Sequence, residues 1–329
     1  MADIDIVVPW VDGSDPAWQT EKALYSGETA GDSRNIRYRD WDTLRYWFRG
    51  VERFAPWARK VHFVTWGHIP PWLNTDNERL HIVRHSDYIP QEYLPTFSSH
   101  TIELNLHRIE GLAEQFVYFN DDTFLVGPIP ETWWFRDGLP CDQGIIGPYV
   151  ADFRGSIAGI ACNDTEIINS HFKRGEVMRQ KPLNWFNPKY GKLNLFNLAG
   201  LMWQSFTGFM YEHFPNAYLR STYETLWALE YDVLHATSLR KFRDKRDVNQ
   251  YVMRDWQLAS NQFVPRRQRG YASAFTGDSD ETIRQCVLSG KNRVFCLNDC
   301  TWVTDIDAKS RTIHSAFREL LPDKCSFEL

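Results

Sequence analysis

The sequence predicts an α/β protein built on a mostly parallel sheet with helices on both faces. Over the first 120 residues, short apolar runs typical of strands alternate with segments whose apolar residues recur at helical spacing. The length of 329 residues allows one large domain or two ordinary ones. Apolar residues make up 43% and charged residues 24%, which is a globular composition.

The expected elements follow one another in a regular order. Residues 4–8 (IDIVV) form the first strand, and residues 40–54 form an amphipathic helix that Pro56 stops. The same patterns predict strands at residues 61–66, 80–83, 116–119 and 293–297, and helices at residues 99–113 and 308–320.

Two regions interrupt this alternation. Residues 136–200 are rich in Gly, Asn, Pro and aromatic residues, and we expect an insertion or lid there. Residues 200–262 have helical patterns and are expected to form a helical subdomain within the same domain.

Composition and charge exclude several classes of protein. With 37 basic and 42 acidic residues the net charge is -5, so a broad nucleic-acid-binding surface is disfavoured. The chain has no apolar run of about 18 residues and no visible secretory signal, and its six cysteines lack metal-ligand spacing. We therefore expect a cytoplasmic protein with reduced thiols. Aromatic residues make up 15%, either as bulky core or as a lining for sugar faces.

Acidic side chains follow two of the predicted strands. Asp121 and Asp122 come directly after the strand at 116–119, and Asp12 and Asp15 flank Gly13 after the first strand. Ligands of open parallel sheets bind at the carboxyl ends of the strands, and paired carboxylates suit Mg²⁺ or Mn²⁺. The alternative for both segments is an ordinary capped turn.

The candidate basic groups have structural alternatives as well. Arg45 and Arg49 share one helix face and could clamp phosphate oxygens, or pair with neighbouring acids. His213 precedes a helix-breaking proline, where it could face a cleft, although a lone histidine is more often structural. The basic runs at residues 241–246 and 266–269 could bind phosphate or an anionic lipid head group, or be solvated loops.

Taken in order, these segments resemble the Stealth family of sugar-1-phosphate transferases, which includes bacterial capsular polysaccharide phosphotransferases and the animal enzyme that modifies lysosomal mannose. The similarity lies in IDIVVPWVDGSD at 4–15, in a long block running from RDWDTLRYWFRG at 39–50 to QFVYFNDDTFL at 115–125, in EHFPNAYL at 212–219 with KFRDKRDVNQ at 241–250, and in RVFCLND at 293–299. The resemblance implies a glycosyltransferase-like (GT-A or Rossmann-like) core and one catalytic domain over residues 1–329.

The resemblance also implies a reaction. A nucleotide-diphosphate sugar, expected to be a UDP-hexose or UDP-HexNAc, donates its sugar-1-phosphate to a glycan hydroxyl and leaves a nucleoside monophosphate. The acceptor is expected to be a lipid-linked capsule or surface glycan, with possible peripheral association at the inner face of the membrane.

Roles for individual residues follow from that reaction. His213 or Asp122 is the general base, with His213 preferred because imidazole titrates near neutrality. Arg45 and Arg243 are assigned to the phosphates, and Asp121 with Asp122 to a divalent cation, Mg²⁺ or Mn²⁺. The residues assigned to the donor site are Asp12, Gly13, Asp15, Arg49, Asn298 and Asp299.

Two other functions remain open at this point. An ordinary glycosyltransferase would use the same donor and acidic strand ends but release a nucleoside diphosphate. A non-catalytic glycan-binding protein would use the aromatic residues alone.

Overall fold

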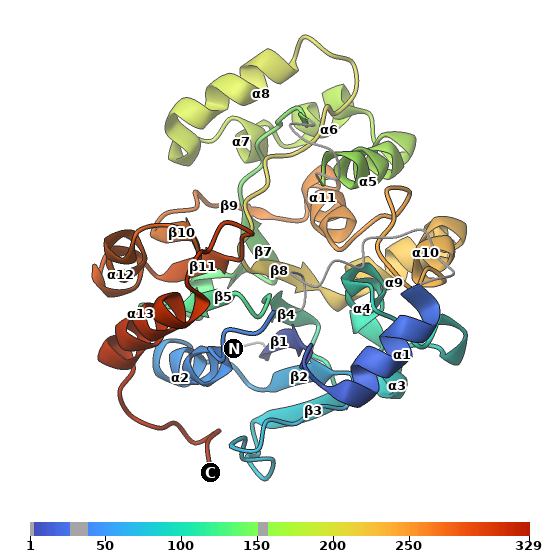
Figure 1. Cartoon of the computed structure of the whole chain (residues 1–329). Coiled ribbons are helices and arrows are strands. Elements are labelled where there is room, and N and C mark those ends of the chain that lie inside the picture. The colour runs from blue at the N-terminus through green and yellow to red at the C-terminus, as the bar shows by residue number, and fades with distance from the viewer. Residues whose placement is uncertain (1–2, 27–38, 151–156) are drawn as a thin grey trace.

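The computed structural model describes residues 3–26, 39–150 and 157–329, and its centre is a five-stranded sheet (Figure 1). The strand order is β3-β2-β1-β4-β8, and β8 alone runs antiparallel to its neighbour. The mostly parallel sheet expected from the sequence is thus confirmed. Its strands are β1 (Ile4–Trp10), β2 (Val61–Thr65), β3 (Leu80–Arg84), β4 (Gln115–Tyr118) and β8 (Asn216–Leu219).

Alternate residues of each strand enter two separate hydrophobic cores, one on each face of the sheet. In β1, Ile6 and Val8 belong to one core and Val7 to the other. The first core is covered by α2 (Leu44–Phe54), α12 (Asp280–Leu288) and α13 (Ile306–Leu320). The second is covered by α4 (Ser99–Leu104), α9 (Arg220–Leu229), α10 (Tyr231–Ser238) and α11 (Tyr251–Ala259). Helices therefore lie on both faces, as predicted.

A second sheet joins distant parts of the chain. Its order is β10-β11-β5, with β10 (Tyr271–Phe275) parallel to β11 (Val294–Asn298) and β11 antiparallel to β5 (Thr123–Leu125). The backbone N–H of Leu297 donates to the carbonyl of Asp122 at 2.9 Å. This pairing holds the end of β4 beside the end of β11. A third small sheet contains β6 (Phe135–Arg136), β7 (Leu139–Asp142) and β9 (Val264–Pro265).

Several expected boundaries are wrong in detail. The helix expected at 99–113 ends at Leu104 and continues only as a short 3-10 turn, Leu106–Arg108. The helical region expected at 200–262 contains strand β8, because Asn216–Leu219 completes the main sheet beside β4. Tertiary pairing decides this short segment, which is too brief for periodicity to classify.

The region at 136–200 is more regular than expected. Beyond β6 and β7 it contains α5 (Ala158–His171), α6 (Arg174–Gln180), α7 (Pro182–Trp185) and α8 (Asn194–Gly200). These helices lie together at one end of the molecule, away from β3 and the C-terminus (Figure 1). Its predicted role as an insertion or lid stays a prediction.

The helix α1 (Pro16–Ser26) and the short α3 (His85–Tyr88) complete the described helices. Within the ranges given above, none of the helices has both the length and the apolarity needed to cross a bilayer.

Candidate active site

The ends of β4 and β11 bring two acidic segments together. Asp121 and Asp122 follow β4, while Asp299 follows Asn298, the last residue of β11. The antiparallel pairing of β5 with β11 sets Thr123 opposite Cys296, so the two carboxyl-bearing turns are neighbours in space. Residues separated by more than 170 positions in the sequence thus share one sheet edge.

His213 lies between these turns and is held by several polar contacts. Its Nδ1 is 3.7 Å from Asp122 Oδ2 and 3.1 Å from Asn298 Oδ1, and its Nε2 is 2.7 Å from Asn120 Nδ2. With the Asn120 amide as donor, Nε2 is the acceptor and Nδ1 carries the ring proton. The thiol of Cys296 lies 3.4 Å from Nδ1. These contacts fix the ring at the end of the sheet.

Two buried carboxylate oxygens in this cluster have no hydrogen-bond partner within the part of the chain that the structure describes. They are Asp122 Oδ1 and Asp299 Oδ2. The other oxygen of Asp299 accepts hydrogen bonds from the Thr276 hydroxyl at 2.9 Å and the Cys300 N–H at 2.8 Å. An unpaired buried carboxylate oxygen is costly, so these two atoms fit a ligand such as a hard cation.

The electrostatics of the cluster agree with this geometry. Burial raises the pKa of Asp122, and Asp299 adds to the rise, while His213 and Arg243 oppose it. The pKa of Asp121 is raised to about 7, first because surrounding protein withdraws its carboxyl from bulk water and then because Asp122 and Asp40 repel its charge. Asp121 is nevertheless exposed at the surface, so its withdrawal from water is incomplete. Like charges this close favour a bound cation.

Arg243 supplies positive charge near Asp122. It lies in the loop after α10, and its guanidinium donates to Ser99 Oγ at the start of α4 at 2.5 Å. The positive charge of Arg243 opposes the rise in the pKa of Asp122, so the two groups interact electrostatically. The structure therefore brings Arg243 into the same region as Asp122 and His213.

A cavity of about 800 Å³ opens beside this cluster at the end of β1. Arg39 lines the cavity and also pairs with Asp299 at 3.4 Å, which joins the two features. Asp40 lines it too, and its pKa is raised by burial. Three tryptophans, Trp10, Trp66 and Trp72, form part of the cavity walls together with polar and charged residues.

The predicted donor residues at the end of β1 line this cavity but already have partners. Asp12 Oδ1 accepts from the Ser14 N–H at 2.9 Å and its hydroxyl at 2.6 Å. Asp15 Oδ1 accepts the Trp18 N–H at 2.8 Å, which caps α1 and lowers the pKa of Asp15. With Gly13, these two carboxylates shape the turn that bounds the cavity.

The printed contacts of the two arginines of α2 are with residues outside the strand-end cluster. The Arg49 guanidinium bonds both carboxylate oxygens of Glu328, at 2.6 and 2.8 Å, and the carbonyl of Leu321 at 2.9 Å. It anchors the C-terminal segment and is not among the residues that line the cavity, and its assignment to the donor site stays a prediction. Arg45 stacks over Trp72, which lines the cavity, with 5.2 Å between its guanidinium carbon and the ring centroid. The assignment of Arg45 to the phosphates stays a prediction.

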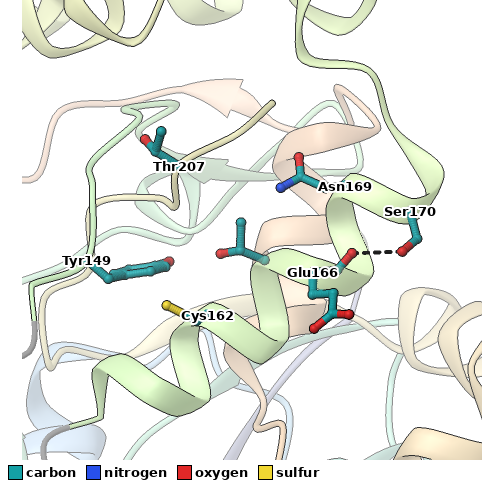
Figure 2. Close-up of a pocket in the computed structure, with 7 residues that line it drawn as sticks. Tyr149, Cys162, Glu166, Asn169, Ser170 and Thr207 are labelled. Atoms are coloured by element: carbon teal, nitrogen blue, oxygen red, sulfur yellow. Dashed lines mark hydrogen bonds between the residues drawn. The ribbon is translucent and has the colours of Figure 1, made fainter. Parts of the chain in front are cut away.

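A second cavity, of about 410 Å³, lies along α5 (Figure 2). Tyr149, Cys162 and Thr207 line it, and Figure 2 shows the Ser170 hydroxyl donating to the backbone carbonyl of Glu166 at 2.9 Å. None of the residues lining it belongs to the strand-end cluster, so the chemistry described above lies elsewhere.

Sequence reasoning missed four described residues of the site. Asn120 directly precedes the predicted pair Asp121 and Asp122, and its amide contacts His213. Arg39 and Asp40 stand directly before the predicted helix at 40–54, and a loop entering a helix at the sheet edge was the available signal. Ser99, which contacts Arg243, had no distinguishing pattern.

The α/β fold thus gathers carboxylates and a histidine near the ends of strands, with an arginine close by, and comparison with known proteins identifies the class of protein. Two family models match the chain. Stealth protein CR1, conserved region 1, matches residues 2–30, and Stealth protein CR2, conserved region 2, matches residues 37–141. The chain belongs to the Stealth family and is a phosphotransferase.

The similar proteins cover the whole chain. The sequence is 37% identical to the capsular polysaccharide phosphotransferase WcwK of Streptococcus pneumoniae, over 100% of this chain and 98% of that protein. It is 39% identical to the receptor polysaccharide phosphotransferase WefC of Streptococcus oralis, over 100% of both. Among solved structures, the galactosyltransferase LgtC is 11% identical with a TM-score of 0.41, covering 98% of this chain and 96% of that chain, a similarity too weak for further conclusions.

Proposed function

We propose that this protein transfers a sugar-1-phosphate from a nucleotide-diphosphate sugar to a hydroxyl of a glycan acceptor during capsule or surface polysaccharide synthesis. The reaction forms a phosphodiester and releases a nucleoside monophosphate. Support comes from the relatives, which are named polysaccharide phosphotransferases. The observation that carries the proposal is the pair of unpartnered carboxylate oxygens beside His213 and Arg243.

The donor occupies the cavity at the end of β1, with its pyrophosphate directed to the strand-end cluster. The tryptophan walls suit a flat nucleobase, and we infer a uridine nucleotide with a hexose or HexNAc sugar. Arg39 lies at the junction of cavity and cluster and can meet a phosphate oxygen there. The turn at Asp12, Gly13 and Asp15 bounds the nucleotide end of the cavity.

A divalent cation, Mg²⁺ or Mn²⁺, would be held by Asp122 and Asp299, with Asp121 beside them. The oxygen donors that lack partners fit such an ion, since hard cations prefer carboxylate ligands. When bound, the ion supplies positive charge that neutralises the diphosphate and its leaving group.

The side chains of the cluster account for the remaining chemistry. The acceptor oxygen forms a bond to the β-phosphorus as its proton passes to His213 or Asp122. The bond from that phosphorus to the bridging oxygen breaks, and the electron pair leaves with the nucleoside monophosphate. Arg243 offsets the negative charge that gathers on the phosphoryl oxygens. Between the two candidate bases, His213 is preferred. Among the described residues, its Nε2 lone pair accepts one hydrogen bond, from the Asn120 amide, which the acceptor hydroxyl can replace.

Product analysis tests this proposal. Purified protein, Mg²⁺, a panel of UDP-sugars and a glycan acceptor should yield UMP, and the product should carry a phosphodiester signal in ³¹P NMR. The His213→Ala variant should lose this activity, whereas His171→Ala, a matched change at an exposed histidine paired with Glu230, should keep it.

The contrary outcomes are equally clear. Release of UDP with no phosphorus in the product identifies an ordinary glycosyltransferase. Tight binding of glycans with no consumption of any donor identifies a glycan-binding protein.

A further inference from the structure

Helix α8 is attached to the protein by its polar side. Asn197 is fully buried, and its side chain accepts from the Ile146 N–H at 2.7 Å and donates to the Gly144 carbonyl at 2.7 Å and to the Trp185 carbonyl. Gly200, also buried, faces Ile146, where a Cβ would meet side-chain atoms at 3.2 Å. A polar residue and a glycine thus occupy the contacts that apolar side chains usually fill.

The apolar residues of α8 and its continuation face outward instead. Met202 is 82% exposed, Leu195 64% and Leu198 58%. Of the 19 large hydrophobic residues exposed in the described ranges, seven lie within residues 183–203. These seven, which we term the α8 face, are Leu183, Leu195, Phe196, Leu198, Leu201, Met202 and Trp203. Such a concentration is costly in water and marks a surface that something apolar covers.

The segment that carries the α8 face has an excess of positive charge. Residues 173–203 contain six basic residues and one acidic residue, a net charge of +5 within a chain whose net charge is -5. Arg174 is buried against the carbonyl of Trp203, and the other five are exposed: Lys173, Arg179, Lys181, Lys189 and Lys192. Of these, Lys181 and Lys189 also donate to the carbonyls of Asn261 and Pro265, at 3.2 and 3.1 Å, while remaining exposed. The segment therefore combines exposed apolar residues with exposed positive charge.

The basic run at residues 241–246, which the sequence offered for lipid head groups, is mostly committed to the protein. The Lys241 ammonium donates to the carbonyls of Tyr93 and Leu94, at 3.1 and 3.0 Å. Arg246 pairs with Asp244 at 2.7 Å. A surface for anionic lipid is better sought at α8.

We propose that the α8 face docks onto the surface of an anionic lipid bilayer. Exposed Leu, Met, Phe and Trp side chains enter the boundary between head groups and acyl chains, and the lysines around them meet lipid phosphates. A protein partner or a second copy of this chain, itself net acidic, would have to provide both an apolar surface and acidic groups at its margin, whereas an anionic membrane offers both everywhere.

The short chain distance between α8 and His213 links docking at α8 to the candidate active site. Trp203 and His213 are ten positions apart in the chain, which limits their separation to about 35 Å. The connecting segment is pinned by Phe206 and Phe209, both buried, and by the bridge between Phe209 and Ile146. If the proposed function holds, docking at α8 presents the strand-end cluster to an acceptor carried on lipid.

Vesicle sedimentation tests the docking without requiring any enzymatic activity. Wild-type protein should sediment with vesicles of phosphatidylglycerol and phosphatidylcholine, and bind vesicles of phosphatidylcholine alone about tenfold less. The double variant Leu195→Glu/Met202→Glu should lose binding to the anionic vesicles by tenfold or more. Leu229→Glu, a matched change at an exposed leucine of α9, should bind like wild type. Circular dichroism confirms that each variant is folded.

Equal binding by wild type and the double variant would overturn the proposal. So would a wild-type protein that ignores vesicles but elutes as a dimer on size exclusion, with the double variant monomeric, because the α8 face would then be a subunit interface. Failure of the donor assay with intact vesicle binding would remove the proposed function and leave the docking standing.

Discussion

Asp5 and Asp122 are two carboxylates at opposite ends of neighbouring strands with opposite environments. Asp5 is fully buried and saturated: it accepts bonds from Arg59 at 2.8 and 2.6 Å and from the Ala113 N–H at 2.8 Å, and it lies 3.0 Å from His62 Nε2. Its pKa is lowered to about 2, because these partners outweigh the burial. Asp122 has an unpartnered oxygen and a raised pKa.

The difference in hydrogen bonding distinguishes a structural carboxylate from a functional one. A carboxylate that the fold has satisfied contributes to stability, and a carboxylate left unsatisfied at a strand end lowers stability until a ligand arrives. Asp299, with one bonded and one free oxygen, belongs with Asp122. Substitutions at the two kinds of position should therefore affect different measurements.

The largest expected effect is on turnover when the unsatisfied carboxylates are neutralised. Asp122→Asn and Asp299→Asn should each lower kcat/KM by about 10³-fold or more, because each removes charge that holds the cation and diphosphate. UMP release measures this. Activity within tenfold of wild type in either folded variant would contradict the comparison.

Replacing His213 should have the next largest effect. His213→Gln preserves polarity but cannot accept the acceptor proton near neutrality, so kcat should fall by about 10²- to 10⁴-fold with little change in KM for the donor. Steady-state kinetics at saturating donor measure the two parameters. If kcat is retained in His213→Gln, His213 is not the base and Asp122 is the remaining candidate.

The two arginines give a matched pair. Arg243→Ala should lower kcat by about 10²-fold with little loss of melting temperature, since the guanidinium acts on phosphoryl charge. Arg49→Ala should do the reverse, because it leaves the buried carboxylate of Glu328 without its partner and costs about 3 kcal/mol of stability. Exchange of these two phenotypes would show that the roles are misassigned.

Asp5→Asn should reduce stability by about 3 kcal/mol while leaving turnover per folded molecule unchanged. The wild-type contribution has a defined pH window. Since the folded pKa of Asp5, about 2, lies below its ordinary value of 3.8, the stabilisation is present above pH 4 and is lost as pH falls from 4 towards 2. Between pH 4 and pH 2, the free energy of unfolding measured with denaturant should fall less steeply in the variant than in the wild type.

The smallest expected effect is a gain of stability, whereas Asp5→Asn causes a loss. Because the folded pKa of Asp122 is raised, its ionisation disfavours the folded state above the ordinary carboxyl pKa, and the penalty is absent below it. Asp122→Asn should therefore raise the melting temperature slightly at pH 8 in the absence of divalent cations, and not at pH 3. A lower melting temperature at pH 8 would place Asp122 with Asp5 as a structural residue.

Local patterns in the sequence predicted four of the five strands of the main sheet and both acidic turns, but neither β8 nor the arrangement of these elements. The strand expected at 293–297 is real as β11, yet it lies in a second sheet whose pairing with β5 spans more than 160 residues. Periodicity reports only local structure, so the meeting of Asp122 with Asp299 could not be derived from it. The family resemblance alone suggested that these residues act together.

The arginines illustrate the same limit. Arg45 and Arg49 have equivalent positions on one helix face, and spacing cannot distinguish them. Their different contacts are made with distant parts of the chain: Arg45 packs on Trp72, and Arg49 pairs with Glu328. Likewise, helical patterning could not reveal that α8 turns its apolar residues outward, since burial depends on Asn197 meeting the loop at Gly144.

Titration with Mn²⁺ followed by electron paramagnetic resonance tests the central claim most directly. If the free oxygens of Asp122 and Asp299 form a cation site, wild type should bind one Mn²⁺ that Mg²⁺ displaces, with affinity increased by UDP-sugar. The double variant Asp122→Asn/Asp299→Asn should bind none, and Asp5→Asn should bind like wild type. Unchanged stoichiometry and affinity in the double variant would contradict the account.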